Sequence, residues 1–267
     1  MPTIDINGTE IFYTDEGPRD APAMVLSHSL FFDHTMFDHQ VDFFEDRMRV
    51  IRYDHRGQGR SDPAEMHSVD MDTLTEDAAE LIKALEVAPC LFVGNSMGGF
   101  VALRLAARMP ELLTGCVVLG TSAEEEHKLE EFAPLVEAMG AHGAEPVIDA
   151  LMHIMFGDTI VADAERADLV AHWKTKMLDL DENIARSAHG VIHRDSVLEE
   201  LEHAHVPILV LAGREDHAYE VPLSEHIAES APQAIMQIVP NAGHSVALEE
   251  HAVANDYIAS FAETLRT

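Results

Sequence analysis

The chain has 267 residues, of which 47% are hydrophobic, and carries 48 acidic against 17 basic residues, a formal net charge of −31. This length suits one large α/β domain, and the hydrophobic content excludes wholesale disorder. An acidic surface repels nucleic acid and anionic membranes, so we expect neither as a partner. Two hypotheses account for the charge. The protein is adapted to high salt, in which dissolved ions screen the repulsion between its acidic groups, or it has an acidic surface without such adaptation.

The sequence carries few signals of export. No apolar stretch reaches the roughly 20 residues that span a bilayer. The N-terminus has neither the basic start nor the apolar run of a secretory signal. Cys90 and Cys116 both lie in apolar runs and are expected to be reduced core residues. We therefore expect a cytoplasmic protein.

Strands and helices are predicted to alternate through the first 122 residues. Asn7-Gly8 separates two β-forming runs and predicts a hairpin. Apolar runs predict further strands at 23–27, 50–54, 91–95 and 113–119. Helical periodicity appears at 36–44, at 78–85 with Thr75 as a candidate cap, and after Ser96. This alternation predicts a mostly parallel sheet covered by helices on both faces.

The segment 123–204 has helical periodicity and little strand signal. It is too long for one crossover connection, so we expect a helical lid over the carboxyl edge of the sheet. The strand pattern resumes at 206–213 and 234–239, and a helix from 246 to 265 closes the chain. The expected organisation is a single domain, 1–267, with a core of 1–122 and 205–267.

The pattern Gly94-x-Ser96-x-Gly98 lies between a predicted strand and a predicted helix. This is the nucleophile-elbow pattern, in which a strained turn lifts a serine hydroxyl above the edge of a sheet. The flanking glycines allow the strand and the helix to approach closely. Ser96 is therefore the candidate nucleophile.

A serine needs a base, and the base needs an acid that orients it. Asp216 and His244 follow the predicted strands at 206–213 and 234–239, at the same sheet edge as Ser96. The order Ser96, Asp216, His244 is that of a hydrolase triad. Glu215 is the rival acid.

Two backbone N–H groups are needed to bind an oxyanion. Met97 follows the nucleophile directly and would supply one of them. The loop His28-Ser29-Leu30, after the strand at 23–27, would supply the other through Leu30.

On these motifs the chain resembles the α/β-hydrolase fold superfamily over essentially its full length. The resemblance implies a mostly parallel eight-stranded sheet with a helical lid. Within the superfamily the chain is similar to the 3-oxoadipate enol-lactonase-like group. The finer likeness rests on Ser27-His28-Ser29-Leu30, on Arg52-Tyr53-Asp54-His55-Arg56-Gly57, and on Ser96-Met97-Gly98-Gly99.

The chain departs from that group in two places. Ser29 stands where most of the superfamily has glycine. The group also carries a Trp and an Arg in the first lid helices, which hold the substrate carboxylate. Residues 123–163 contain neither; the later candidates are Trp173, Arg166, Arg186 and Arg194. The methionines and phenylalanine of 152–156 favour an apolar acyl or alkyl group instead.

The sequence thus predicts a cofactor-free serine hydrolase that cleaves a small carboxylic ester or lactone through an acyl-enzyme on Ser96. C–C bond hydrolysis and cofactor-free perhydrolysis use the same triad, and a hydrolase-fold receptor with little turnover is a further alternative. No metal is expected, because the helical pair His189 and His193 lacks an accompanying HExxH or Cys/His cluster. A homo-oligomer is compatible with the sequence.

Overall fold

The computed structural model describes residues 2–265. Eight strands form one sheet, in the order β1-β2-β4-β3-β5-β6-β7-β8. Their bounds are β1 (Thr3–Ile6), β2 (Thr9–Glu16), β3 (Ala23–Ser27), β4 (Arg49–Tyr53), β5 (Cys90–Asn95), β6 (Leu113–Leu119), β7 (Ile208–Gly213) and β8 (Ala234–Val239).

The α-helices follow the alternation that the sequence predicts. Their bounds are α1 (Asp38–Phe44), α2 (Met71–Ala84), α3 (Met97–Arg108), α4 (Leu129–His142), α5 (Ile148–Met155), α6 (Asp158–Ala162), α7 (Ala167–Leu178), α8 (Ile184–Ile192), α9 (Leu198–Leu201), α10 (Val221–Ser230), α11 (Val246–Glu249) and α12 (His251–Thr264). Among residues 2–265, no helix combines the length and apolar character needed to cross a bilayer.

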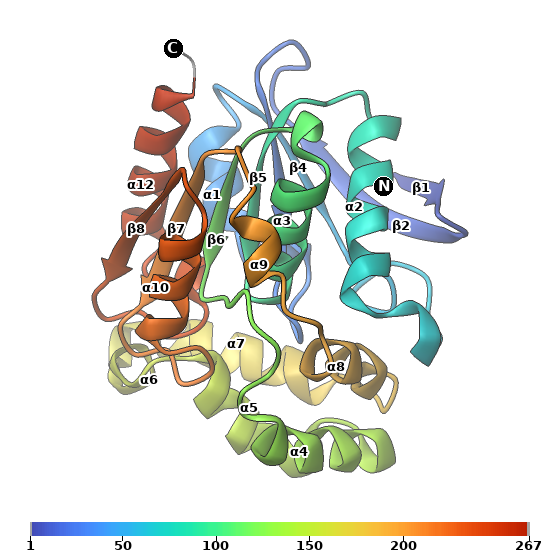
Figure 1. The fold of residues 1–267 in the computed structure, drawn as a ribbon. Helices are drawn as coiled ribbons and strands as arrows, with labels where there is room; N and C mark the ends of the chain where they lie inside the picture. The colour runs from blue at the N-terminus through green and yellow to red at the C-terminus, as the bar shows by residue number, and fades with distance from the viewer. Residues whose placement is uncertain (1, 266–267) are drawn as a thin grey trace.

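The sheet confirms the α/β-hydrolase fold class. β1 and β2 pair antiparallel as the predicted hairpin, and β2 pairs antiparallel with β4. All later pairings are parallel. Helices α2, α3, α9 and α10 pack as one layer, while α1, α11 and α12 form the other (Figure 1). Because β5 and β7 are buried along their whole length, they read as continuous apolar runs.

Two local expectations are corrected by the structure. Thr75 does not cap α2, because it lies one turn into the helix and is buried. The helix is capped by Asp70, whose carboxylate accepts from the Thr73 N–H at 2.8 Å. The predicted helix at 36–44 starts as a 3-10 helix over His34–Phe37 before α1 begins. Both errors concern a boundary, where a side chain two or three residues away decides the start.

Along the chain, helices α4 to α9 all come after β6 and before β7. Figure 1 shows α4 to α8 gathered at one end of the molecule, below the sheet in that view. α9 instead packs against α3 and α10. The division into a core and a lid remains a prediction about domain organisation.

Candidate active site

Ser96 lies in the turn between β5 and α3, with φ +52° and ψ −112°. A positive φ is uncommon for a residue with a Cβ and has to be held by its surroundings. Here the Ser96 N–H donates to the Leu119 carbonyl at 2.8 Å, and the Ser96 carbonyl accepts from the Thr121 hydroxyl at 3.0 Å. Both partners come from β6 and the loop that follows it, so the neighbouring strand fixes the strained turn.

The glycines of the turn are required by close backbone approach. A Cβ on Gly94 would lie 2.1 Å from the Gly98 carbonyl oxygen, and a Cβ on Gly98 would lie 2.0 Å from that of Ser27. In both cases the obstacle is backbone, which cannot turn aside. The spacing Gly94-x-Ser96-x-Gly98 is thus explained by the packing of α3 on β3 and β5.

His244 lies on the loop after β8 and contacts the carboxylate of Asp216 on the loop after β7. The imidazole Nδ1 lies 3.0 Å from one Asp216 oxygen and 3.1 Å from the other. Asp216 also accepts from the N–H groups of Ala218 and Tyr219, both at 2.8 Å. Such a held carboxylate fixes the ring so that Nε2 is free to accept a proton.

The rival acid, Glu215, points elsewhere. Its carboxylate accepts from the N–H of Thr159 at 2.7 Å and from the hydroxyl of the same residue. The structure therefore brings Asp216 to His244 and directs Glu215 to α6.

Of the expected oxyanion donors, Met97 directly follows Ser96 and Leu30 lies on the loop after β3. Leu30 lines the same cavity as Ser96 and His244. Met97 is the first residue of α3, where N–H groups have no acceptor within the helix and the helix dipole favours negative charge. That these two N–H groups bind an oxyanion stays a prediction.

A buried histidine pair supports the loop that carries Leu30. The backbone N–H of His55 donates to Nε2 of the His28 ring at 3.0 Å. The other ring nitrogen of His28, Nδ1, therefore carries the proton and donates to the Ser29 carbonyl at 2.8 Å. Burial lowers the pKa of both rings, so both stay neutral and this tautomer is kept.

Asn95 and the unusual Ser29 form a link that leaves no pattern in the sequence. The amide nitrogen of Asn95 donates to the Ser29 hydroxyl at 2.9 Å and to the His244 carbonyl at 3.0 Å. The Ser29 hydroxyl in turn donates to the Asn95 carbonyl at 3.2 Å. One amide thus joins the oxyanion loop, the elbow and the histidine loop.

Glu249, on α11, is a second positioning residue that sequence reasoning missed. Its buried carboxylate accepts from the N–H groups of Gly157, Gly243 and Ser245, each at 2.9 Å. Two of these amides flank His244, and the third belongs to the turn between α5 and α6. Burial raises the pKa of Glu249 to about 7. The hydrogen bonds from the three amides lower this pKa, but their effect is smaller than that of burial.

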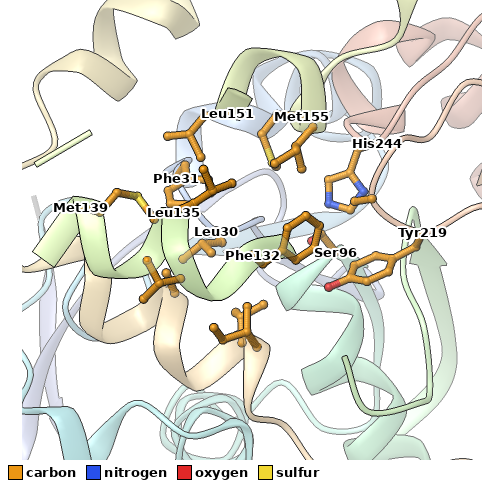
Figure 2. A pocket seen from close by; sticks show the side chains of 16 residues that line it. Leu30, Phe31, Ser96, Phe132, Leu135, Met139, Leu151, Met155, Tyr219 and His244 are labelled. Atoms are coloured by element: carbon orange, nitrogen blue, oxygen red, sulfur yellow. The ribbon is translucent and has the colours of Figure 1, made fainter. Parts of the chain in front are cut away.

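A cavity of about 500 Å³, open mouth included, opens above Ser96. Figure 2 shows Ser96, His244 and Tyr219 on one side of it and Met139 on the opposite side. Among the described residues, its lining has no carboxylate, ammonium or guanidinium group. The remaining wall is almost entirely apolar and is supplied by Leu30, Phe31, Phe132, Leu135, Val136, Met139, Leu151, Ile154, Met155, Ala188, Val191, Ile192 and Ala218.

The cationic candidates for a substrate carboxylate lie outside this lining. Arg194 is buried and ion-paired with Glu126 at 2.8 Å. Arg166 donates to the carbonyls of Leu248 and Glu249, and Arg186 to that of Ala64. Trp173 is buried against Phe32, with ring centroids 4.6 Å apart.

Comparison with known proteins agrees with this geometry. A family model described as serine aminopeptidase, S33 (Hydrolase_4), matches residues 21–251. The chain belongs to this family. Members have the α/β-hydrolase fold, which the eight-stranded sheet shows directly.

Three proteins similar to this chain carry the names of different activities. A protein named as a carbamate hydrolase, from Pseudomonas syringae pv. syringae, is 29% identical over 229 residues, 85% of this chain and 88% of its own. A non-heme chloroperoxidase from Streptomyces lividans is 29% identical over 237 residues, 84% of each chain. The crystal structure of the enol-lactonase from Burkholderia xenovorans LB400 superposes with a TM-score of 0.91 at 26% identity, covering 98% of this chain and 100% of the other. The enol-lactonase likeness agrees with the resemblance drawn from the sequence.

Proposed function

We propose that this hydrolase cleaves small, uncharged carboxylic esters or lactones through an acyl-enzyme on Ser96. The observation that carries the proposal is that Ser96 and His244 line one apolar cavity, while His244 is hydrogen-bonded to Asp216. The proposal concerns the bond that is cleaved and the class of group that the cavity accepts.

The reaction follows from the roles of these side chains. Nε2 of His244 accepts the Ser96 hydroxyl proton as the oxygen attacks the carbonyl carbon. Asp216 stabilises the imidazolium that forms, and the N–H groups of Leu30 and Met97 bind the oxyanion. His244 then protonates the leaving alkoxide. A water molecule, deprotonated by His244, attacks the acyl-enzyme and releases the acid and free Ser96.

The cavity wall argues for an apolar substrate. A carboxylate brought into this cavity would lose its hydration without gaining a cationic partner, which is costly. We therefore propose esters or lactones with an uncharged aliphatic acyl group, in place of the carboxylate-bearing lactone that the enol-lactonase resemblance implies.

The test is a substrate panel of p-nitrophenyl acetate, butyrate and octanoate, an aliphatic lactone and a lactone that carries a free carboxylate. We expect turnover of the uncharged compounds and at least about a 10-fold lower kcat/KM for the carboxylate lactone. Ser96→Ala should abolish turnover. Ser224→Ala, which removes a buried hydroxyl in α10, is the matched control and should keep it.

Two outcomes would contradict the proposal. If folded wild type and Ser96→Ala were equally inactive on every compound, the enzyme function would fail and the receptor alternative would stand. If the carboxylate lactone were the best substrate, the argument from the apolar wall would fail while the triad remained.

Perhydrolysis is a second candidate, favoured by the likeness to a protein named as a chloroperoxidase. In that reaction hydrogen peroxide replaces water in attacking the acyl-enzyme, and a peracid leaves instead of the acid. Peracid formation from acetate and hydrogen peroxide measures it, and Ser96→Ala should abolish it too.

A further inference from the structure

Outside the cavity, three side chains from three separate segments lie close together. His153 lies on α5, Asp158 begins α6, and His217 directly follows Asp216 on the loop after β7. Each offers one ligand atom, and these atoms all lie within 4.8 Å of one another. We propose that they form a surface site for a divalent transition-metal ion, with zinc as the representative, which joins helices α5 and α6 to the loop of the catalytic acid.

The distances suit such an ion. Nε2 of His217 lies 3.2 Å from a carboxylate oxygen of Asp158. Two ligands of a tetrahedral zinc, each about 2.0–2.1 Å from the metal, are separated by roughly 3.3 Å. The ring of His153 stacks on that of His217 with centroids 4.1 Å apart. His153 is exposed, so a rotation of its side chain can close the remaining gap.

The backbone around Asp158 is held in place on both sides. The Gly157 N–H donates to Glu249 at 2.9 Å, and the Thr159 N–H donates to Glu215 at 2.7 Å. The carbonyl of His217 accepts from the Lys128 ammonium at 2.6 Å. Two of the three ligands thus extend from anchored backbone, and less freedom is lost when a metal binds.

The donor set determines the kind of ion. Two imidazoles and one carboxylate suit zinc, copper or nickel, whereas calcium and magnesium prefer oxygen ligands. The net charge of −31 raises the local concentration of any cation at the surface. Because His153 and Asp158 do not line the cavity, the ion would act on structure: it would tie α5, which supplies Leu151 and Met155 to the cavity wall, to the Asp216 loop.

The chain offers a matched control in a second pair of stacked histidines. His189 and His193 on α8 have ring centroids 4.0 Å apart. Within the described residues, no third ligand completes that pair into a cluster. Their spacing is visible in the sequence, whereas the cluster of His153, Asp158 and His217 is formed by folding alone.

The experiment titrates metal-free protein with Zn²⁺ in a calorimeter and measures the melting temperature at each concentration. We expect one strong site and a rise in Tm of about 5 °C or more at saturating zinc, with no rise in Ca²⁺. His153→Ala and His217→Ala should each weaken zinc binding about 10-fold or more and remove the rise in Tm. The double variant of His189→Ala and His193→Ala should keep both.

The proposal is overturned if zinc affinity is unchanged in His153→Ala and His217→Ala, or is lost only in the double variant. Since His153 is exposed, His153→Ala should fold, which circular dichroism checks. Co²⁺ gives a second measurement, because its visible spectrum should change between wild type and His153→Ala. The catalytic proposal is independent of this result, since metal-free wild type should still hydrolyse p-nitrophenyl butyrate.

Discussion

The two sides of the cavity are built in different ways. On the sheet side, buried polar groups contact one another through hydrogen bonds: His244 with Asp216, and Asn95 with Ser29. On the helical side, α4, α5 and α8 contribute Leu, Ile, Val, Met and Phe side chains, which contact through apolar surface. The first side has direction, because each hydrogen bond fixes a donor and an acceptor. The contacts of the second side have no such direction, so that side defines mainly the volume and shape of the cavity.

The difference teaches which properties each side can control. In the proposed mechanism, the reaction is determined by the hydrogen bonds that hold the nucleophile, the base and the oxyanion loop. Small displacements of these groups are costly. An apolar wall determines which groups fit, and a methylene more or less changes selectivity only about 10- to 200-fold. Changes on the sheet side should therefore lower turnover for every substrate, and changes on the helical side should re-rank substrates.

The largest effect on turnover is expected from Asp216, the carboxylate that orients His244. Asp216→Asn keeps the shape but donates where the carboxylate accepted, which favours the wrong tautomer of His244. We expect kcat on p-nitrophenyl butyrate to fall about 10⁴-fold with little change in KM. Glu215→Gln is the matched control, because Glu215 contacts Thr159, and it should stay within a few-fold of wild type. A greater loss in Glu215→Gln than in Asp216→Asn would reverse the assignment of the acid.

The sequence predicted more of the sheet side than of the helical side, for the same physical reason. A strained elbow forces glycines at fixed spacing, so Gly94 and Gly98 reveal Ser96 without a structure. The carboxyl ends of parallel strands meet at one edge, which placed Asp216 and His244 there. Glu249 and Asn95 were missed because their partners are backbone amides, a backbone carbonyl and a hydroxyl, which leave no pattern in the sequence. Residues 152–156 indicated an apolar wall, and Met155 does line the cavity, but the shape of the wall was not predicted because many apolar sequences produce one of similar volume.

A second prediction concerns the carboxylate that holds the histidine loop. Burial raises the pKa of Glu249 from its ordinary 4.5 to about 7. Between these pH values the folded protein keeps a proton that the unfolded chain has lost, so the free energy of unfolding should fall as pH rises. The fall should be on the order of 3 kcal/mol and should level off above pH 7.

Urea unfolding of wild type and Glu249→Gln at pH 5, 6, 7 and 8 measures this dependence. The free energy of unfolding of wild type minus that of the variant should decrease across the window, because Gln cannot titrate. Parallel curves would show that the pKa of Glu249 in the folded protein is near its ordinary value. The three amides would then offset the effect of burial on this pKa.

A third prediction tests whether Asn95 couples the loops of the sheet side. Asn95→Ala leaves the Ser29 hydroxyl and the His244 carbonyl without their amide partner, though Asn95 itself does not line the cavity. We expect kcat to fall about 10- to 100-fold at nearly constant KM, with stability lowered by about 1–3 kcal/mol. Ser29→Ala removes one of these contacts and should have the smaller effect. An unchanged kcat in a destabilised Asn95→Ala would assign this residue a role in folding alone.

The smallest effect is expected on the helical side, and it should depend on the substrate. Met139 is buried on α4, on the side of the cavity opposite Ser96 (Figure 2). Met139→Trp fills that end, so kcat/KM for p-nitrophenyl octanoate should fall about 10-fold while that for acetate stays near wild type. Leu129→Trp, at an exposed position of the same helix, is the matched control and should change neither. If Met139→Trp lowered acetate and octanoate turnover equally, α4 would influence the catalytic groups themselves, and the separation between a side that sets the reaction and a side that sets the substrate would fail.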